Sequence, residues 1–208
     1  MKRTKAMDVL FMIDATGSMA NTIQAAHEKA EDLAFELHIS NRKALFKFAC
    51  ICYRDPVYAP SDVHQVFDFD EEIENLATFL EDVKASGGGD GPEDYVGALN
   101  EAFNSLSWRD NSKRAIIWIA DAPAHGQRYC GSSNHQEEEP KLEPLVKQLA
   151  QDRYYFVSIS LNNGEKDPDK EIPFRIESFS PEKGNEIKRI TETMAESTKA
   201  MVNEALFE

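Results

Sequence analysis

Residues 7–18 read MDVLFMIDATGS, an almost unbroken apolar run that passes directly into a turn with three polar residues and a glycine. A short continuous apolar run of this kind is typical of a strand that is buried on both faces of a parallel sheet. Residues 19–39 then show the spacing of an amphipathic helix, with the apolar residues on one face. We therefore expect a buried strand at 7–13 followed by a helix at 19–39.

The alternation of strand-like and helix-like segments continues along the chain. Further strand-like runs lie at 45–53, 64–69, 115–120, 154–161 and 174–179. Helix-like segments lie at 71–85, from Pro92 onward, at 140–151 and at 181–206. This alternation predicts an α/β fold of the doubly wound, Rossmann-like type, in which a mostly parallel central sheet is flanked by helices on both faces.

Length and composition predict one globular domain. The chain has 208 residues, of which 41% are hydrophobic and 29% charged, and neither a repeat nor a linker divides it. We expect a single domain over 1–208 with a core over about 7–207. The net charge of −14 would repel nucleic-acid backbones and anionic membranes. It suits divalent cations and basic protein surfaces instead.

The compartment is predicted from hydropathy and cysteine use. No apolar run approaches the roughly 20 residues that span a bilayer. A basic start at residues 1–5 precedes an apolar stretch, but Asp8 and Asp14 interrupt it and no small-residue cleavage site follows. Three cysteines give an odd count, and Cys50 and Cys52 are too close on one strand to pair well. We expect free thiols and a cytoplasmic protein.

The first polar turn has the ligands that a hard cation prefers. Asp14, Thr16 and Ser18 place one carboxylate and two hydroxyls at alternate positions after the first strand. Mg²⁺ takes oxygen ligands in octahedral geometry, and Gly17 allows the backbone to turn tightly between the two hydroxyl residues. The alternative is structural: Asp14 ends a strand and Ser18 caps a helix.

Two further acidic turns adjoin predicted strand ends. The stretch GGGDGPED at 87–94 contains three carboxylates, among them those of Asp90 and Glu93. Its proline is expected to open a helix, with Asp90 or the glycine after it just before the helix. Asp121 follows the apolar strand at 115–120. Helix-dipole compensation and turn formation are the structural alternatives. Ligands bind doubly wound folds beyond the carboxyl ends of the strands, so all three turns would face one rim.

The first turn resembles a family motif. Asp14-x-Thr16-x-Ser18, followed by Met19, resembles the D-x-[ST]-G-S motif of von Willebrand factor A domains, which forms a metal-ion-dependent adhesion site. The family completes that site with a threonine from a second loop and an aspartate from a third. The resemblance implies that Asp121 is the third-loop aspartate.

The second loop departs from this family pattern. No threonine lies between positions 86 and 101, so the resemblance leaves Asp90, our first choice, or Glu93 as the substitute ligand. A carboxylate there would bind the resting metal more tightly and weaken its demand for an acidic residue of a partner. The stretches 87–94 and 119–126 resemble the A domain of the alpha-kinase family. We expect no kinase domain, because the chain has no glycine-rich nucleotide loop followed by a strand lysine.

The resemblance implies a metal-dependent protein-binding domain that is not an enzyme, with Mg²⁺ as the ion and Mn²⁺ or Ca²⁺ as alternatives. Its partner would be a protein, and neither nucleic acid nor a membrane. The enzyme alternative is a metal-dependent phosphoesterase, because clustered acids can hold Mg²⁺ against phosphate. Arg54 and Arg128 are the candidates for its phosphate clamp, but neither belongs to a recognisable motif.

Two other site types are weaker alternatives. Ser18, His125 and Asp121 offer the residue types of a serine hydrolase, but the chain has no G-x-S-x-G elbow. His125, Cys130 and His135 share the polar segment 125–139, as a zinc site would require. Their spacing matches no zinc signature, so we interpret this segment as a polar loop with incidental ligands that borders the rim.

Overall fold

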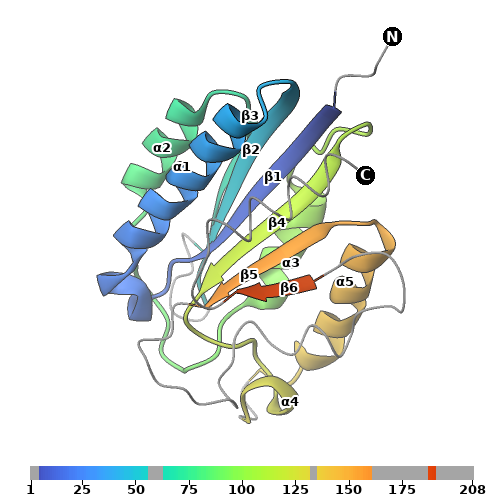
Figure 1. Ribbon diagram of the computed structural model, residues 1–208. Coiled ribbons are helices and arrows are strands. Elements are labelled where there is room, and N and C mark those ends of the chain that lie inside the picture. Colours follow the sequence, from blue (N-terminus) through green and yellow to red (C-terminus); the bar gives the residue numbers. More distant parts are fainter. Residues whose placement is uncertain (1–4, 56–62, 132–134, 161–186, 191–208) are drawn as a thin grey trace.

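The computed structural model describes residues 5–55, 63–131, 135–160 and 187–190, in which six strands form one sheet (Figure 1). The strands are β1 (Lys5–Asp14), β2 (Ala44–Tyr53), β3 (His64–Asp70), β4 (Lys113–Ala120), β5 (Tyr155–Ser160) and β6 (Ile187–Ile190). The helices are the 3₁₀ turn η1 (Gly17–Asn21), α1 (Ile23–Ser40), α2 (Ile73–Asp82), α3 (Tyr95–Asn104), α4 (Gln127–Cys130) and α5 (Glu139–Gln151).

The sheet has the order β3-β2-β1-β4-β5-β6 and is parallel except for β3, which runs antiparallel to β2. The chain therefore starts at a central strand, continues to one side, and returns to the other side with β4. The carboxyl ends of β1, β2 and β4 lie at one edge of the sheet. In such a fold the point between β1 and β4, where the strand order reverses, is where ligands bind. The predicted doubly wound fold is confirmed.

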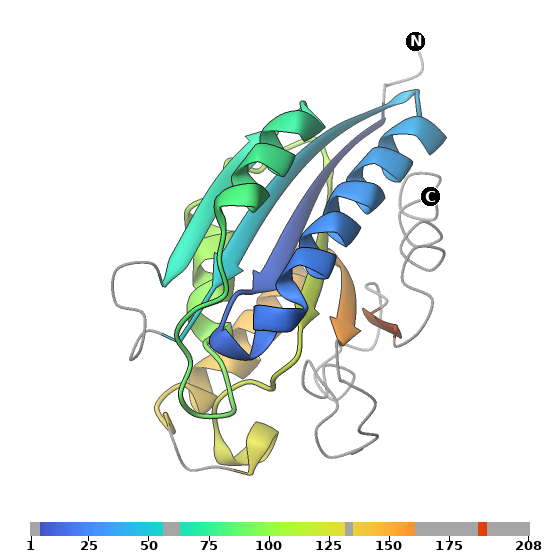
Figure 2. The ribbon, with the colours of Figure 1, turned by 90° about the vertical axis from the view of Figure 1, so that its left-hand side faces the viewer.

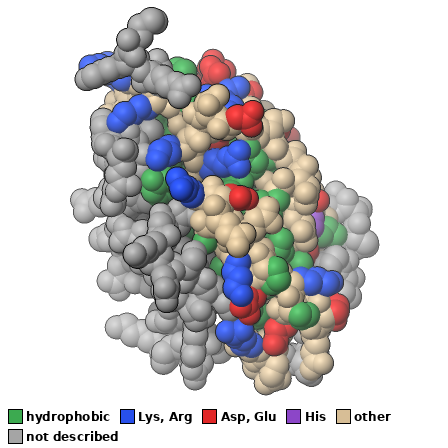
Figure 3. Space-filling view, turned by 90° about the vertical axis from the view of Figure 1, so that its right-hand side faces the viewer, with side chains coloured by type: hydrophobic (Ala, Val, Ile, Leu, Met, Phe, Trp, Pro, Cys, Tyr) green, Lys and Arg blue, Asp and Glu red, His purple; other side chains and the backbone are tan. Residues whose placement is uncertain are grey.

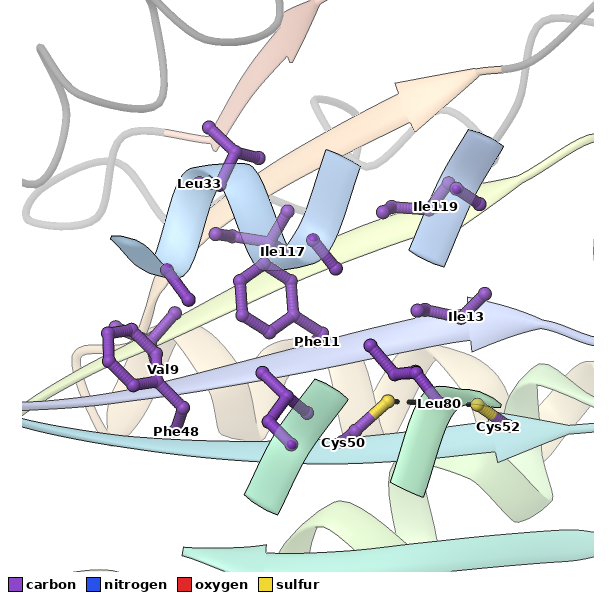
Figure 4. Packing of buried hydrophobic residues seen from close by; sticks show 14 of the residues in the cluster. Val9, Phe11, Ile13, Leu33, Phe48, Cys50, Cys52, Leu80, Ile117 and Ile119 are labelled. Carbon is purple, nitrogen blue, oxygen red and sulfur yellow. Dashed lines mark hydrogen bonds between the residues drawn. The ribbon is translucent and has the colours of Figure 1, made fainter. Parts of the chain in front are cut away.

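The central strand β1 is buried on both faces. Val9, Phe11 and Ile13 face α1 and α2, and Leu10 and Met12 face α3 and α5. Figures 1 and 2 show the two helical layers, and Figure 4 shows the packing on the α1 and α2 face. Because both faces are covered, every residue from the strand's third position to its end is buried, which explains the unbroken apolar run.

Aromatic packing fixes the carboxyl edge of the sheet to the face that α3 and α5 cover. The Trp118 ring lies 4.4 Å from the Tyr95 ring, and Trp118 Nε1 donates to Tyr53 Oη at 2.8 Å. Tyr95 Oη donates to the carbonyl oxygen of Ala122 at 2.7 Å. All three rings are fully buried. The loop that follows β4 is thus fixed to the start of α3.

The helix after Pro92 begins later than the sequence predicts. Asp94, and neither Asp90 nor Gly91, is its N-cap, and the Asp94 side chain accepts from the backbone nitrogen of Gly97 at 2.6 Å. The reason is tertiary, because Glu93 pairs as a short parallel bridge with the loop after β4. A residue held in a bridge has extended backbone and cannot start a helix.

Two other differences concern the second half of the chain. The predicted helix at 181–206 is wrong at residues 187–190, which form β6 beside β5. An exposed strand edge offers unpaired backbone groups, and pairing with them decides the conformation of so short a segment. The rest of that segment and the predicted strand at 174–179 lie outside the described residues. The polar segment 125–139 includes the short helix α4.

Cysteine state and surface agree with a globular domain. The three cysteines are free, as predicted. Within the described ranges, no helix has the length and hydropathy of a membrane span. Figure 3 shows the face on the α5 side, where charges of both signs are mixed and hydrophobic side chains are scattered.

A buried ion pair at the opposite edge yields a stability prediction. Asp8 is fully buried and accepts from Arg109 Nε at 2.6 Å and from Arg109 N at 2.8 Å. Arg109→Met leaves the carboxylate without its charge partner, so we expect a loss of about 3 kcal/mol in unfolding free energy. Urea denaturation measures it. Arg42→Met, at an exposed position, is the control, and an equal effect in both variants would contradict the prediction.

Candidate functional site

Three loops meet at the carboxyl edge of the sheet. The loop after β1 is tied to the loop before α3 by two backbone hydrogen bonds, from Gly17 N to Gly87 O at 3.0 Å and from Ser86 N to Ala15 O at 2.9 Å. A Cβ on Gly17 would lie 2.7 Å from Gly87 O, which is too close for any other residue. The loop before α3 also binds the loop after β4, through Glu93 N and the carbonyl oxygen of Pro123 at 2.8 Å.

Four predicted ligands form one continuous chain of hydrogen bonds. Thr16 donates to Asp14 Oδ1 from its backbone nitrogen at 2.9 Å and from Oγ1 at 2.7 Å. Thr16 Oγ1 lies 3.1 Å from Ser18 Oγ, and Ser18 Oγ donates to Asp121 Oδ1 at 2.9 Å. Asp14 and Thr16 are fully buried, whereas Ser18 is exposed. The chain therefore runs from the interior to the surface.

The second loop directs Glu93 toward this chain. Glu93 is 2% exposed, and a Cβ on Gly88 would lie 3.6 Å from Glu93 Oε1 and 3.5 Å from Thr16 Cβ. Both side chains therefore pack around the same glycine. The charge of Asp14 acts on Glu93 and raises its pKa. By position, Glu93 is the carboxylate of the second loop that accompanies Asp14, Thr16 and Ser18.

Burial and like charges dominate the electrostatics of this group. Burial raises the pKa of Asp14 to about 7, against the lowering effect of its hydrogen bonds from Thr16, and the charge of Asp121 adds to the rise. Burial raises the pKa of Glu93 to about 9, and the charges of Asp14 and Asp121 add to it. Asp14 Oδ2 and Glu93 Oε2 are buried and accept no hydrogen bond from the described residues. Both oxygens are of the type that binds divalent cations.

Asp90 lies in a different group. Its Oδ2 is 3.8 Å from His135 Nε2, and its carboxylate clusters with Asp55 and His125 as well as His135. The structure therefore brings Glu93 close to Thr16 and places Asp90, the first choice from the sequence, in the other group. Asp55 is a member of this group that was not predicted from the sequence. Its position was the available signal, because Asp55 comes two residues after the apolar strand β2, much as Asp14 ends β1 and Asp121 follows β4.

The serine hydrolase arrangement is absent from the described residues. Ser18 Oγ has Asp121 and Thr16 as its partners, whereas His125 Nδ1 lies 2.7 Å from Glu138 Oε2. Since no Ser–His pair forms, Ser18 has no general base.

The two arginines considered as phosphate clamps have structural partners. Arg54 is 1% exposed, and its Nη2 donates to Gln65 Oε1 and to the carbonyl oxygen of Lys84. Arg128 Nη1 donates to Glu143 Oε2 at 3.3 Å. Both guanidinium groups are thus engaged in hydrogen bonds with other residues of the chain.

Comparison with known proteins identifies relatives that are similar to this chain over one domain. The sequence profile of the von Willebrand factor A domain matches residues 8–157. The alpha-protein kinase vwkA of Dictyostelium discoideum is 32% identical over 166 residues, which cover 77% of this chain and 26% of that protein. This chain thus spans about a quarter of the length of that relative.

Solved structures share the fold. The conserved hypothetical protein BatB from Bacteroides thetaiotaomicron gives a TM-score of 0.57 at 16% identity and covers 96% of this chain and 98% of its own. Proximal thread matrix protein 1 from the mussel byssus, with a zinc-occupied metal-ion-dependent adhesion site, gives a TM-score of 0.58 at 15% identity. That match covers 97% of this chain and 45% of the mussel chain. At such identities the likeness concerns the fold alone.

The raised pKa of Glu93 leads to a prediction about the thermal stability of the metal-free protein. Its folded pKa of about 9 exceeds its ordinary value of 4.5, so ionisation disfavours the folded state increasingly as the pH rises from 4.5 to 9. Glu93→Gln removes this titration. At pH 8 in the presence of a metal chelator, we expect the Tm of the Glu93→Gln variant to exceed that of wild type by about 2–4 °C. In a domain of this size, such a shift corresponds to a gain of about 1 kcal/mol in the free energy of unfolding.

Thermal denaturation at pH 8 and pH 4 measures this difference, which should disappear at the lower pH. Glu81→Gln removes a carboxylate from an exposed position on α2 and is the matched control. A Glu93→Gln variant that is less stable than wild type in chelator at pH 8 would show that the buried carboxylate is not under electrostatic strain.

Proposed function

This chain belongs to the von Willebrand factor A domain family, and we propose that it is a metal-dependent protein-interaction domain. One observation supports this proposal above the others. Carboxylates and hydroxyls from three loops converge at the carboxyl edge, and Asp14 Oδ2 and Glu93 Oε2 are buried there with no hydrogen-bond partner among the described residues. Members of this family are usually interaction modules without catalytic activity.

The proposed ligands all offer oxygen. Asp14, Thr16, Ser18, Glu93 and Asp121 are those ligands, some of which would bind through water. Oxygen donors of this kind suit Mg²⁺ and also Mn²⁺ or Ca²⁺. We propose Mg²⁺ as the ion, because a site with two hydroxyls and few direct carboxylates leaves room for the waters that Mg²⁺ retains.

The site is open on one side. Asp14, Thr16 and Glu93 are buried, whereas Ser18 is exposed and Asp121 half-buried. A protein partner would therefore approach the Ser18 and Asp121 side, where a side-chain oxygen of the partner could replace a metal-bound water.

Glu93 departs from the general family pattern at this site. The glutamate carboxylate brings a negative charge to the position where the family pattern has a neutral threonine. A metal ion with more protein charge around it attracts a partner's carboxylate less strongly. We therefore propose that this domain holds its metal tightly and recognises a partner mainly through the loops around the site, with the metal fixing their shape.

The phosphoesterase alternative gains no support from the described residues. The guanidinium groups of Arg54 and Arg128 are held by Gln65, Lys84 and Glu143. The kinase activity that the name of vwkA states belongs to a protein of which this chain covers 26%. We propose no catalytic role for the domain.

Calorimetry tests the metal site. Mg²⁺ and Mn²⁺ should bind wild type, and Asp14→Asn should abolish the heat because it removes the charge at the buried end of the ligand chain. Glu93→Thr should weaken binding at least tenfold, which corresponds to about 1.4 kcal/mol. Asp82→Asn, at an exposed position at the end of α2, is the control. Equal heats in wild type and Asp14→Asn would refute the metal site.

Affinity capture tests the interaction. Wild-type bait in Mg²⁺ should retain a protein partner that is lost both in chelator and with Asp14→Asn bait, because both treatments remove the metal. Retention that is independent of metal and of Asp14 would contradict a metal-dependent interaction. Hydrolysis of phosphoesters by wild type, lost in Asp14→Asn, would favour the enzyme alternative instead.

A further inference from the structure

A second group of ligand-type side chains lies beside the proposed magnesium site. Asp55, Asp90, His125 and His135 each offer one atom, and these four atoms lie within 4.8 Å of one another. The residues come from the end of β2, the loop before α3, the loop after β4 and the turn before α5. We propose that these four side chains bind a zinc ion, at a site separate from the family's metal site.

The separations within the group approach those of a tetrahedral zinc site. With metal–ligand bonds of 2.0–2.2 Å, the ligand atoms of a tetrahedron lie about 3.4 Å apart. His125 Nε2 is 3.4 Å from Asp55 Oδ2. His135 Nε2 is 3.8 Å from Asp90 Oδ2 and 4.0 Å from Asp55 Oδ2. The remaining pairs lie within 4.8 Å, so some of the ligand atoms would have to approach one another by up to about 1.4 Å to bind zinc.

A carboxylate lies near the outer nitrogen of each imidazole, within hydrogen-bond distance at His125 and slightly beyond it at His135. His125 Nδ1 lies 2.7 Å from Glu138 Oε2, and His135 Nδ1 lies 3.6 Å from Glu137 Oε1. A carboxylate that accepts from Nδ1–H leaves the lone pair on Nε2, and zinc-bound histidines in proteins regularly have such a partner. Here both Nε2 atoms face the two aspartates.

The environment of His125 favours a metal ligand over an incidental loop histidine. Its side chain is fully buried, and its Nε2 makes no hydrogen bond with the described residues. The rings of His125 and His135 have centroids 4.2 Å apart. Two imidazolium ions would repel each other at this distance, whereas two neutral rings can share one cation.

The donor set selects zinc over magnesium. Imidazole nitrogen is a common ligand of zinc, whereas Mg²⁺ prefers oxygen and water. Four protein ligands complete a tetrahedron and leave no open position, which is the pattern of a structural zinc site. Cys130 is not a ligand, because its thiol donates to the carbonyl oxygen of Gly126 at 3.1 Å.

A zinc ion here would link the loops that form the first site. Asp90 is in the loop that carries Glu93, and His125 is in the loop that carries Asp121. The zinc would hold both loops against the end of β2 and pre-organise the rim where a partner binds.

Metal analysis and spectroscopy of the full chain test this site. Wild type should retain about one zinc ion per chain there, and Co²⁺ in its place should give the strong visible bands of tetrahedral coordination. His135→Asn removes a ligand nitrogen at a residue whose φ is 53°, a conformation that asparagine tolerates. We expect it to weaken zinc binding at least a hundredfold, beyond the roughly ten- to hundredfold of an outer-shell change such as Glu138→Gln.

Two control variants distinguish zinc binding at this site from binding at surface histidines or at the magnesium site. His38→Asn, at an exposed position near the end of α1, should leave zinc binding unchanged. Asp14→Asn should lose Mg²⁺ but keep the tetrahedral Co²⁺ spectrum, so failure of one site is distinguishable from failure of the other. An octahedral Co²⁺ spectrum, wild-type zinc affinity in His135→Asn, or complete loss of zinc in Asp14→Asn would each overturn the proposal.

Discussion

The burial of a carboxylate at the end of the central strand is the constraint on which the carboxyl edge of this sheet depends. β1 lies between β2 and β4 and beneath helices on both faces, so Asp14 has no access to water. An ionised group in such a place must be met by donors or by a cation. Thr16 provides two donors to one oxygen, and the other oxygen accepts no hydrogen bond from the described residues.

The second and third loops follow from the same constraint. The second loop approaches the first closely enough to require Gly17, and its bridge to the third loop turns Glu93 inward where the first turn of a helix was expected. The result is an excess of negative charge at one rim of a chain with net charge −14. A fold that concentrates buried acids in this way gains stability when it binds a cation.

Two donor sets of different chemistry lie side by side on this rim. Asp14, Thr16 and Glu93 offer oxygen alone, whereas His125 and His135 add imidazole nitrogen to two aspartates. Oxygen-only and mixed sets select different ions, so neighbouring sites could be filled independently. The second set would determine the shape of the loops, and the first would form part of the surface that a partner contacts.

The sequence by itself determined the doubly wound fold and the first metal motif, because both rest on local patterns. An apolar strand buried on both faces reads as a continuous run, and Asp14, Thr16 and Ser18 lie within five residues of one another. The choice between Asp90 and Glu93 depended on a bridge to a loop some thirty residues away. The grouping of Asp55 with His125 and His135 likewise joins segments that are distant in the chain. Only the tertiary structure could decide these points, because spacing along a chain carries no information about contacts made through the fold.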